Sequence, residues 1–190
     1  AWKPKLSMFN DLPGEYKLGA LYSTAEAKDV KTTGKVHDGK QSFWLNAQQQ
    51  LTQQGADPKR GLYISFNGVI NDKATTTVQS TQQIALWYKG PLENRPNDSV
   101  GFGLANYVVN ERVQDRQIAT NQSRGYDRYD AFANDYTPIQ RDELNVELNY
   151  TYQWSPAVML RPNLQYIHQP AGVKEVDDAW VAGLSMRVNF

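Results

Sequence analysis

The sequence predicts an all-β protein, a transmembrane antiparallel β-barrel with about eight strands in this chain. Two strand-length segments carry the prediction: in residues 180–190, and again in residues 141–154, apolar and polar side chains alternate. Successive side chains of a strand point to opposite faces, so each segment has one apolar face and one mostly polar face. An outer-membrane barrel turns the apolar face to lipid and the polar face to a wet lumen.

The positions of the aromatic residues favour a membrane over a soluble core. Tyr150, Tyr152 and Trp154 gather at one end of their strand, directly before the turn at residues 155–157. Trp180 and Phe190 lie at opposite ends of the last strand. Membrane barrels carry aromatic girdles at both water interfaces, so this distribution indicates a membrane-spanning sheet.

The strands follow one another in order along the chain. Alternation predicts them at residues 15–23, 41–52, 60–70, 78–88, 99–109, 141–154, 158–168 and 180–190. Turn signals rich in Pro and Gly occur at residues 11–14 and 89–98. Pro162 is unusual, because it removes one hydrogen-bond donor from a strand that a barrel pairs on both sides.

The connections alternate between the two ends of the strands. Residues 24–40, 71–77, 110–140 and 169–177 fall at one end and are expected outside the cell, while the shorter connections become periplasmic turns. Short periplasmic turns and longer outer loops are typical of barrels. The longest connection, 110–140, mixes charges with several aromatic residues and is expected to be an ordered loop.

Composition excludes several classes of protein. The 190 residues suffice for one domain or part of a larger one, and the formal net charge of zero gives no indication of a nucleic-acid partner. Cysteine is absent, and no run of 18 apolar residues predicts a transmembrane helix. No signal peptide is recognisable, so Ala1 either follows a cleavage site or begins a piece of a longer protein.

Motifs for catalysis or cofactor binding are weak. His37 and His168 are far apart in sequence, and no G-x-S-x-G nucleophile motif exists. Gly101 and Gly103 begin like a dinucleotide fingerprint, but they lie within an alternating strand. Glu143 and Glu147 would be about 13 Å apart on one strand, too far for a glycosidase pair. We therefore expect no enzyme, no cofactor and no metal.

The polar faces supply candidate pore-lining and sugar-binding residues. The arginine side chain presents a fork of donors that suits sugar hydroxyls as well as carboxylates, and aromatic rings can stack on sugars. The alternative is that the charges merely balance one another and the rings pack against a loop folded into the barrel. By alternation, the candidates are Glu143, Asn145, Glu147, Asn149, Arg161, Asn163, Gln165, Arg187, Trp44 and Tyr63.

Four stretches of the chain resemble the carbohydrate-selective porins of the OprB family. They are the turn Asp-Leu-Pro-Gly-Glu-Tyr at residues 11–16, the strand at 143–152, the run Leu-Arg-Pro-Asn-Leu-Gln-Tyr at 160–166, and the terminal Arg-Val-Asn-Phe. The resemblance covers the whole chain but only the C-terminal half of the family, whose barrels have sixteen strands. It implies that residues 1–190 form one barrel segment and that an N-terminal half is missing.

The resemblance also implies a function and partners. Such porins let glucose-type monosaccharides diffuse passively through a polar, water-filled channel in the outer membrane of Gram-negative bacteria. The expected partners are small sugars, outer-membrane lipid, the missing N-terminal half, and the outer-membrane assembly machinery, which would read the terminal Phe190. No nucleic acid is expected.

Two alternatives remain open at this stage. Eight strands could close on themselves as a small structural or adhesive barrel, with Gly101 and Gly103 helping to fill its interior. Such a barrel would not conduct sugar. A soluble sugar-binding sandwich would instead bury the apolar strand faces in a core and would need no detergent.

Overall fold

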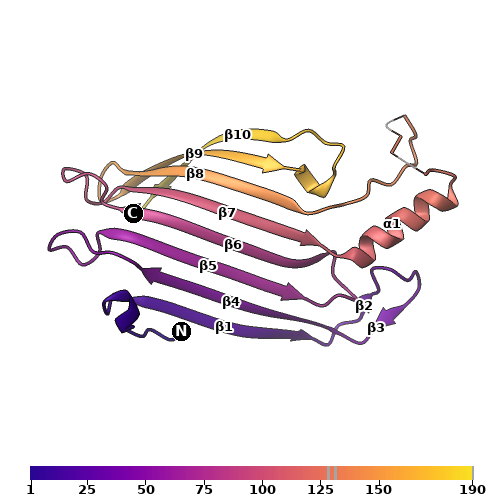
Figure 1. Ribbon diagram of the computed structural model, residues 1–190, viewed down its shortest axis with the longest axis horizontal. Helices are drawn as coiled ribbons and strands as arrows, with labels where there is room; N and C mark the ends of the chain where they lie inside the picture. Colours follow the sequence, from indigo (N-terminus) through magenta and orange to yellow (C-terminus); the bar gives the residue numbers. More distant parts are fainter. Residues whose placement is uncertain (128, 131, 190) are drawn as a thin grey trace.

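The strands form one curved antiparallel sheet in the computed structural model, which describes residues 1–127, 129–130 and 132–189 (Figure 1). Each strand pairs with its neighbours along the chain, in the order β1-β4-β5-β6-β7-β8-β9-β10. The bounds are β1 Gly14–Ser23, β4 Lys40–Gln50, β5 Gly61–Asn71, β6 Val78–Lys89, β7 Ser99–Val109, β8 Glu143–Gln153, β9 Val158–His168 and β10 Ala179–Val188.

All eight predicted strands are present, with small shifts at their ends. The largest shifts are two residues: the strand predicted at 41–52 ends at Gln50, the one predicted at 141–154 begins at Glu143, and the one predicted at 180–190 ends at Val188. The terminal Phe190, predicted to end the last strand, lies outside the described residues. Because the strands β1 and β10 are the two edges of an open sheet, the closed eight-stranded barrel is not the arrangement adopted.

The two ends of the sheet differ in their connections. At one end, called here the loop end, lie the β1–β4, β5–β6, β7–β8 and β9–β10 connections. They hold a small ribbon of β2 (Ala27–Lys28) and β3 (Val36–His37), the helix α1 (Glu111–Ser123) and a short 3-10 turn, Pro170–Gly172. The other end, the turn end, carries the β4–β5, β6–β7 and β8–β9 connections and a 3-10 turn, Ser7–Phe9. Figure 1 shows α1 projecting beyond the strands at the loop end.

The predicted ordered loop at 110–140 therefore contains a helix that alternation did not indicate. Asn110 begins it, because its side chain accepts a hydrogen bond from the backbone N–H of Arg112. Val113, Gln117 and Asn121 are the buried residues of α1. No helix among the described residues is long and apolar enough to span a membrane.

The outer face of the sheet is apolar and exposed, as the alternation predicts. Leu18 is 84% exposed and Leu184 is 71% exposed, although both lie within paired strands. Among the described residues, the buried apolar side chains are only Val30, Val109 and Val113. The apolar face covers no core, so the soluble sandwich considered above is not the fold. Other large exposed side chains of the outer face are Phe43, Leu45, Ile70, Ile84, Leu86, Phe102, Leu104, Leu148, Leu164 and Met186.

The sheet accommodates Pro162 by a local gap in one ladder. On the β10 side the register runs through Pro162, which pairs with Leu184. On the β8 side the pairs stop at Asn149 and Asn163 and resume at Tyr152 and Leu160. The missing N–H of proline therefore falls on the β8 side, where the ladder is interrupted.

Candidate functional site

The inner face of the sheet is polar, and Glu147 on β8 is the centre of its hydrogen bonding. Its carboxylate accepts hydrogen bonds from the side-chain amides of Asn149 and Gln165, both at 2.8 Å, and of Asn163 at 3.2 Å. The Arg161 guanidinium lies 3.6 Å from the same carboxylate. Three amide donors and one cation thus fix the position of the Glu147 carboxylate.

A groove of about 580 Å³, called here the inner groove, runs along the inner face from β5 to β9. Its floor includes Gly101 and Gly103 of β7, which lie between β6 and β8 in the sheet. Its polar and aromatic lining residues are Ser65, Asn67, Gln83, Trp87, Tyr107, Asn145, Glu147, Asn149, Arg161 and Gln165.

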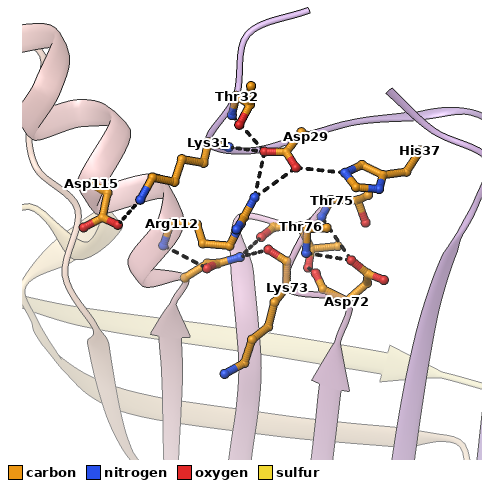
Figure 2. Close-up of polar contacts among 12 residues, drawn as sticks. Asp29, Lys31, Thr32, His37, Asp72, Lys73, Thr75, Thr76, Arg112 and Asp115 are labelled. Atoms are coloured by element: carbon orange, nitrogen blue, oxygen red, sulfur yellow. Dashed lines mark hydrogen bonds and ion pairs between the residues drawn. The ribbon is translucent and has the colours of Figure 1, made fainter. Parts of the chain in front are cut away.

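At the loop end, a buried carboxylate joins two separate segments, the β1–β4 connection and α1 (Figure 2). Asp29 accepts hydrogen bonds from the backbone N–H groups of Lys31 and Thr32, both at 2.8 Å. His37 Nε2 lies 2.8 Å from Asp29, and the Arg112 guanidinium donates to both carboxylate oxygens at 2.9 and 3.0 Å. We call these five residues the loop-end network.

Further contacts extend the loop-end network to the β5–β6 connection. The N–H of Val30 donates to the carbonyl of Ala74 at 2.8 Å. The side-chain amide of Asn110 donates to the carbonyls of Lys73 and Thr76 at 2.7 and 2.8 Å. The β1–β4 connection, the β5–β6 connection and the start of α1 are thereby held as one unit.

The donors around Asp29 also determine its charge state. The hydrogen bond to His37 and those from the backbone of Thr32 and Lys31 hold the pKa of Asp29 far below its usual range. Burial opposes this shift, because it disfavours the charged carboxylate, and the hydrogen bonds outweigh it. Asp29 is therefore an anion at neutral pH.

At the turn end, a second buried carboxylate joins the β6–β7 connection to β8. Asp98 accepts two hydrogen bonds from Arg95, at 2.8 and 2.9 Å. It also accepts the Tyr150 hydroxyl at 2.6 Å and the N–H of Gln153 at 2.9 Å. The Arg95 guanidinium lies 4.0 Å from the ring centre of Tyr152, which suits a cation–π contact. Asp98, Arg95, Tyr150 and Gln153 form the turn-end network.

Comparison with known proteins assigns this geometry to a family. The family model described as "Carbohydrate-selective porin, OprB family" matches residues 1–190. The chain belongs to the OprB family. Members lie in the outer membrane of Gram-negative bacteria, which accounts for the exposed apolar outer face.

Individual OprB relatives agree with this assignment. The chain is 79% identical over 190 residues to the Acinetobacter baylyi protein named "Putative porin QuiX", and 43% identical over 201 residues to Porin B of Pseudomonas aeruginosa. It covers 43% and 44% of those proteins, so it spans less than half of their length.

Two solved structures are also similar. The high-pH structure of OprB from Pseudomonas putida matches with a TM-score of 0.93 and 43% identity, over 100% of this chain and 47% of that one. The low-pH structure matches with a TM-score of 0.64 and 32% identity, over 100% of this chain and 44% of that one. The open sheet is thus the arrangement expected of part of an OprB barrel.

The inner groove brings together part of the predicted site. Asn145, Glu147, Asn149, Arg161 and Gln165 line it. Asn163 does not line it but donates to Glu147 from the neighbouring strand. The alternation of β8 and β9 therefore places these predicted side chains on one wall.

Other predicted residues lie elsewhere on the same sheet. Glu143 accepts from the Asn145 amide at 2.9 Å and from the N–H of Ala171 at 2.6 Å, which ties β8 to the β9–β10 connection. Trp44 covers Gly19 of the neighbouring strand β1, where a Cβ atom would come within 2.4 Å of its ring. Neither residue lines the inner groove.

Arg187 and Tyr63 also lie outside the groove lining. Arg187 Nε donates to Asn189 near the turn end, at 3.2 Å. Tyr63 stacks against Trp87, with ring centres 5.2 Å apart and planes 9° apart. Tyr63 thus lies beside a groove residue, on the same face of the sheet.

Trp87 is one of the groove residues absent from the predicted candidates; Ser65, Asn67, Gln83 and Tyr107 are others. The prediction for its strand rested on the apolar residues Ile84, Leu86 and Tyr88, and Trp87 falls between two of them. The same alternation places Trp87 on the inner face, so the signal was present. A large aromatic residue opposite an apolar row indicates a ring in the lumen.

Proposed function

We propose that this chain forms part of an outer-membrane porin through which monosaccharides of the glucose type diffuse passively. One observation carries the proposal: a single sheet is apolar on its outer face and polar on its inner face, with the inner groove along the latter. The name of the family, carbohydrate-selective porin, supports a sugar as the solute.

The proposed mechanism involves no chemical reaction. A sugar exchanges hydrogen bonds with water for hydrogen bonds with the wall, and then leaves. Glu147 supplies acceptor oxygens and Arg161 supplies donors, and these groups are 30% and 45% exposed. Binding of this kind must be weak enough to allow release.

The proposal also assigns the surroundings of the sheet. Lipid contacts the apolar outer face, the loop end faces the cell exterior, and the turn end faces the periplasm. A further part of the barrel pairs with the edge strands β1 and β10. Phe190, which lies outside the described residues, serves as the signal for the assembly machinery.

Solute flux through the full-length protein that contains this chain tests the proposal. The protein is reconstituted into liposomes, and swelling is followed in isotonic glucose, in a disaccharide and in a trisaccharide. We expect rapid swelling in glucose and slower swelling as the solute grows. Swelling no faster than in protein-free liposomes would refute the proposal.

A further inference from the structure

We propose that the outer face of the sheet carries a binding site for one acyl chain of lipopolysaccharide, the lipid of the outer leaflet. The chain lies in a hollow over Gly68, and the side-chain amides of Gln82 and Asn106 bind the polar groups near its attachment. The site is on the opposite face of the sheet from the inner groove. It rests on the proposed contact of the outer face with lipid and on the proposed orientation of the loop end, but not on sugar flux.

The hollow, called here the outer hollow, has a volume of about 310 Å³ and lies on β4, β5 and β6. It forms at Gly68, which has no side chain and pairs with Leu45 of β4 and with Gln82 of β6. The ring of Phe66 lies over Gly68, because a Cβ atom there would come within 2.9 Å of that ring. The other lining residues are Phe43, Trp44, Val69, Ile70 and Thr81. The missing side chain thus leaves a depression among mainly apolar residues.

The shape and lining of the outer hollow suit a hydrocarbon chain. Phe43 and Ile70 line it and are 54% and 61% exposed, so an acyl chain between them would gain dispersion contacts on both sides. None of its lining residues in the described part of the chain is charged, so it offers no ion pair to a phosphate group. The three strands span only about 10 Å, whereas a stable protein interface buries about 800 Å² on each partner. One acyl chain therefore fits better than a second copy of the protein.

A polar row borders the outer hollow on an otherwise apolar face. Gln82 pairs with Gly68 on one side and with Asn106 of β7 on the other, so these three residues share one row. The rows on either side of it contain Phe66, Ile84 and Leu104 toward the turn end, and Ile70, Ser80 and Val108 toward the loop end. Polar side chains that face lipid are costly unless they have hydrogen-bond partners, so this row requires an explanation.

The amides of this row satisfy one another only in part. Gln82 Nε2 donates to Ser80 Oγ at 2.7 Å. Asn106 Nδ2 donates to Gln82 Oε1 at 3.4 Å, which is a long and therefore weak hydrogen bond. Within the described residues, Asn106 Oδ1 accepts no hydrogen bond. Each amide has two donor hydrogens and an acceptor oxygen, so both donating and accepting capacity face a medium without water. A ligand that completes the row must itself both donate and accept.

This requirement favours lipopolysaccharide over a phospholipid. Gln82 lies four residues from Val78, the loop-end start of β6, or about 10 Å below it for a strand tilted by about 40°. The apolar band of a barrel is about 25 Å tall, so Gln82 lies in the half next to the loop end. The acyl chains of lipopolysaccharide carry amide and hydroxyl groups close to their attachment, which donate and accept. The ester linkages of phospholipid chains only accept.

Native mass spectrometry of the full-length protein in detergent tests the site. Deep-rough lipopolysaccharide is titrated in, and phosphatidylglycerol, an anionic lipid with ester-linked chains, is titrated in parallel. We expect wild type to bind one lipopolysaccharide molecule more tightly than any further lipid and at least tenfold more tightly than phosphatidylglycerol. Gly68→Leu should weaken this binding about tenfold, because the side chain fills the outer hollow. Gln82→Leu, which keeps the size but removes the amide, should weaken it about fivefold.

The matched control is Ala182→Leu, which also enlarges a small exposed residue of the outer face, in β10, where it pairs with Leu164. It should leave the binding unchanged. The change in electrophoretic mobility on heating shows which variants have folded, and Gln82→Leu remains decisive if Gly68→Leu does not fold.

Equal binding of the two lipids by wild type, or unchanged binding in both Gly68→Leu and Gln82→Leu, would overturn the proposal. An oligomer without bound lipid that both variants dissociate would instead assign the outer hollow to a second copy. The swelling assay tests sugar diffusion separately, so the lipid site can fail while the proposed function stands.

Discussion

Each end of the sheet has a buried aspartate paired with an arginine, but the two pairs differ in how far apart their residues are in the sequence. Asp29 at the loop end is 5% exposed and Asp98 at the turn end is 1% exposed, and each carboxylate accepts several hydrogen bonds. Asp98 receives its cation from Arg95, three residues away. Asp29 receives its cation from Arg112, 83 residues away.

This difference indicates what each network stabilises. The turn-end network closes one turn and joins it to the adjacent strand β8, so its loss should affect the sheet locally. The loop-end network joins the β1–β4 connection to α1, which follow strands that are not neighbours in the sheet. Its loss should release two distant segments together.

The largest effect is expected for Asp29→Ala. The change leaves the donors of Arg112 and His37 without their acceptor, and breaking a buried ion pair is strongly destabilising. Hydrogen exchange in residues 24–39 and 111–123 of the full-length protein should rise by about a hundredfold. Faster exchange in only one of these segments would show that Asp29 does not couple them.

A smaller effect is expected for Asp98→Asn. The amide loses the charge that Arg95 pairs with, and a hydrogen bond to a charged group contributes about 1.5–3 kcal/mol. The free energy of unfolding in urea should fall by about 2 kcal/mol, with hydrogen exchange at the loop end unchanged. Asp57→Asn is the control, because Asp57 lies in another connection at the turn end, where its bond to the N–H of Lys59 is exposed.

The pH dependence should follow from the lowered pKa of Asp29. A carboxylate whose pKa is lower in the folded state stabilises that state above the unfolded pKa, about 3.9, and loses this contribution as the pH falls toward the folded value. Loop-end exchange, corrected for its intrinsic rate, should be the same at pH 7 and pH 5 and should rise below about pH 4.

A matched variant isolates this titration. Asp29→Asn has no ionisable group at the position, so its loop-end exchange should be faster at every pH and lack the rise below about pH 4. An equal rise in the variant would assign the acid sensitivity to other carboxylates. One such carboxylate is Asp178 in the β9–β10 connection, because hydrogen bonds from the Tyr166 hydroxyl and the N–H of Gln169 lower its pKa to about 2.

The smallest effect is expected for Asp115→Asn. Its carboxylate pairs with Lys31 at 2.7 Å beside the loop-end network, but both side chains are about half exposed. Exposed ion pairs contribute about 0–1 kcal/mol, so exchange in residues 24–39 should change less than about fivefold. A change as large as that of Asp29→Ala would show that this surface ion pair stabilises residues 24–39 as much as Asp29 does.

The strands and their faces could be predicted because alternation is a local property. The apolar row from Leu144 to Trp154 and the polar row from Glu143 to Gln153 needed only the sequence of one segment. The same rule placed Glu147 and Arg161 on one wall, although their 3.6 Å contact also depends on the register between β8 and β9.

The loop-end network could not be predicted, because its members are distant and none has an unusual local pattern. Nothing near Asp29 indicates that Arg112 will approach it. The helix α1 was missed for a related reason: its sequence is mostly polar and buries only one apolar residue, Val113. Asn110 followed by Glu111 and a long run without Pro or Gly was the available signal.

The directions of the two edge strands restrict how this sheet can be completed. β1 runs from the turn end to the loop end, and β10 runs back to the turn end. An antiparallel strand added beside β10 must run toward the loop end, and one added beside β1 must run away from it. Any closing segment with antiparallel pairing therefore contributes an even number of strands. The strand that pairs with β10 must begin at the turn end, which is the end of the sheet where β10 itself ends.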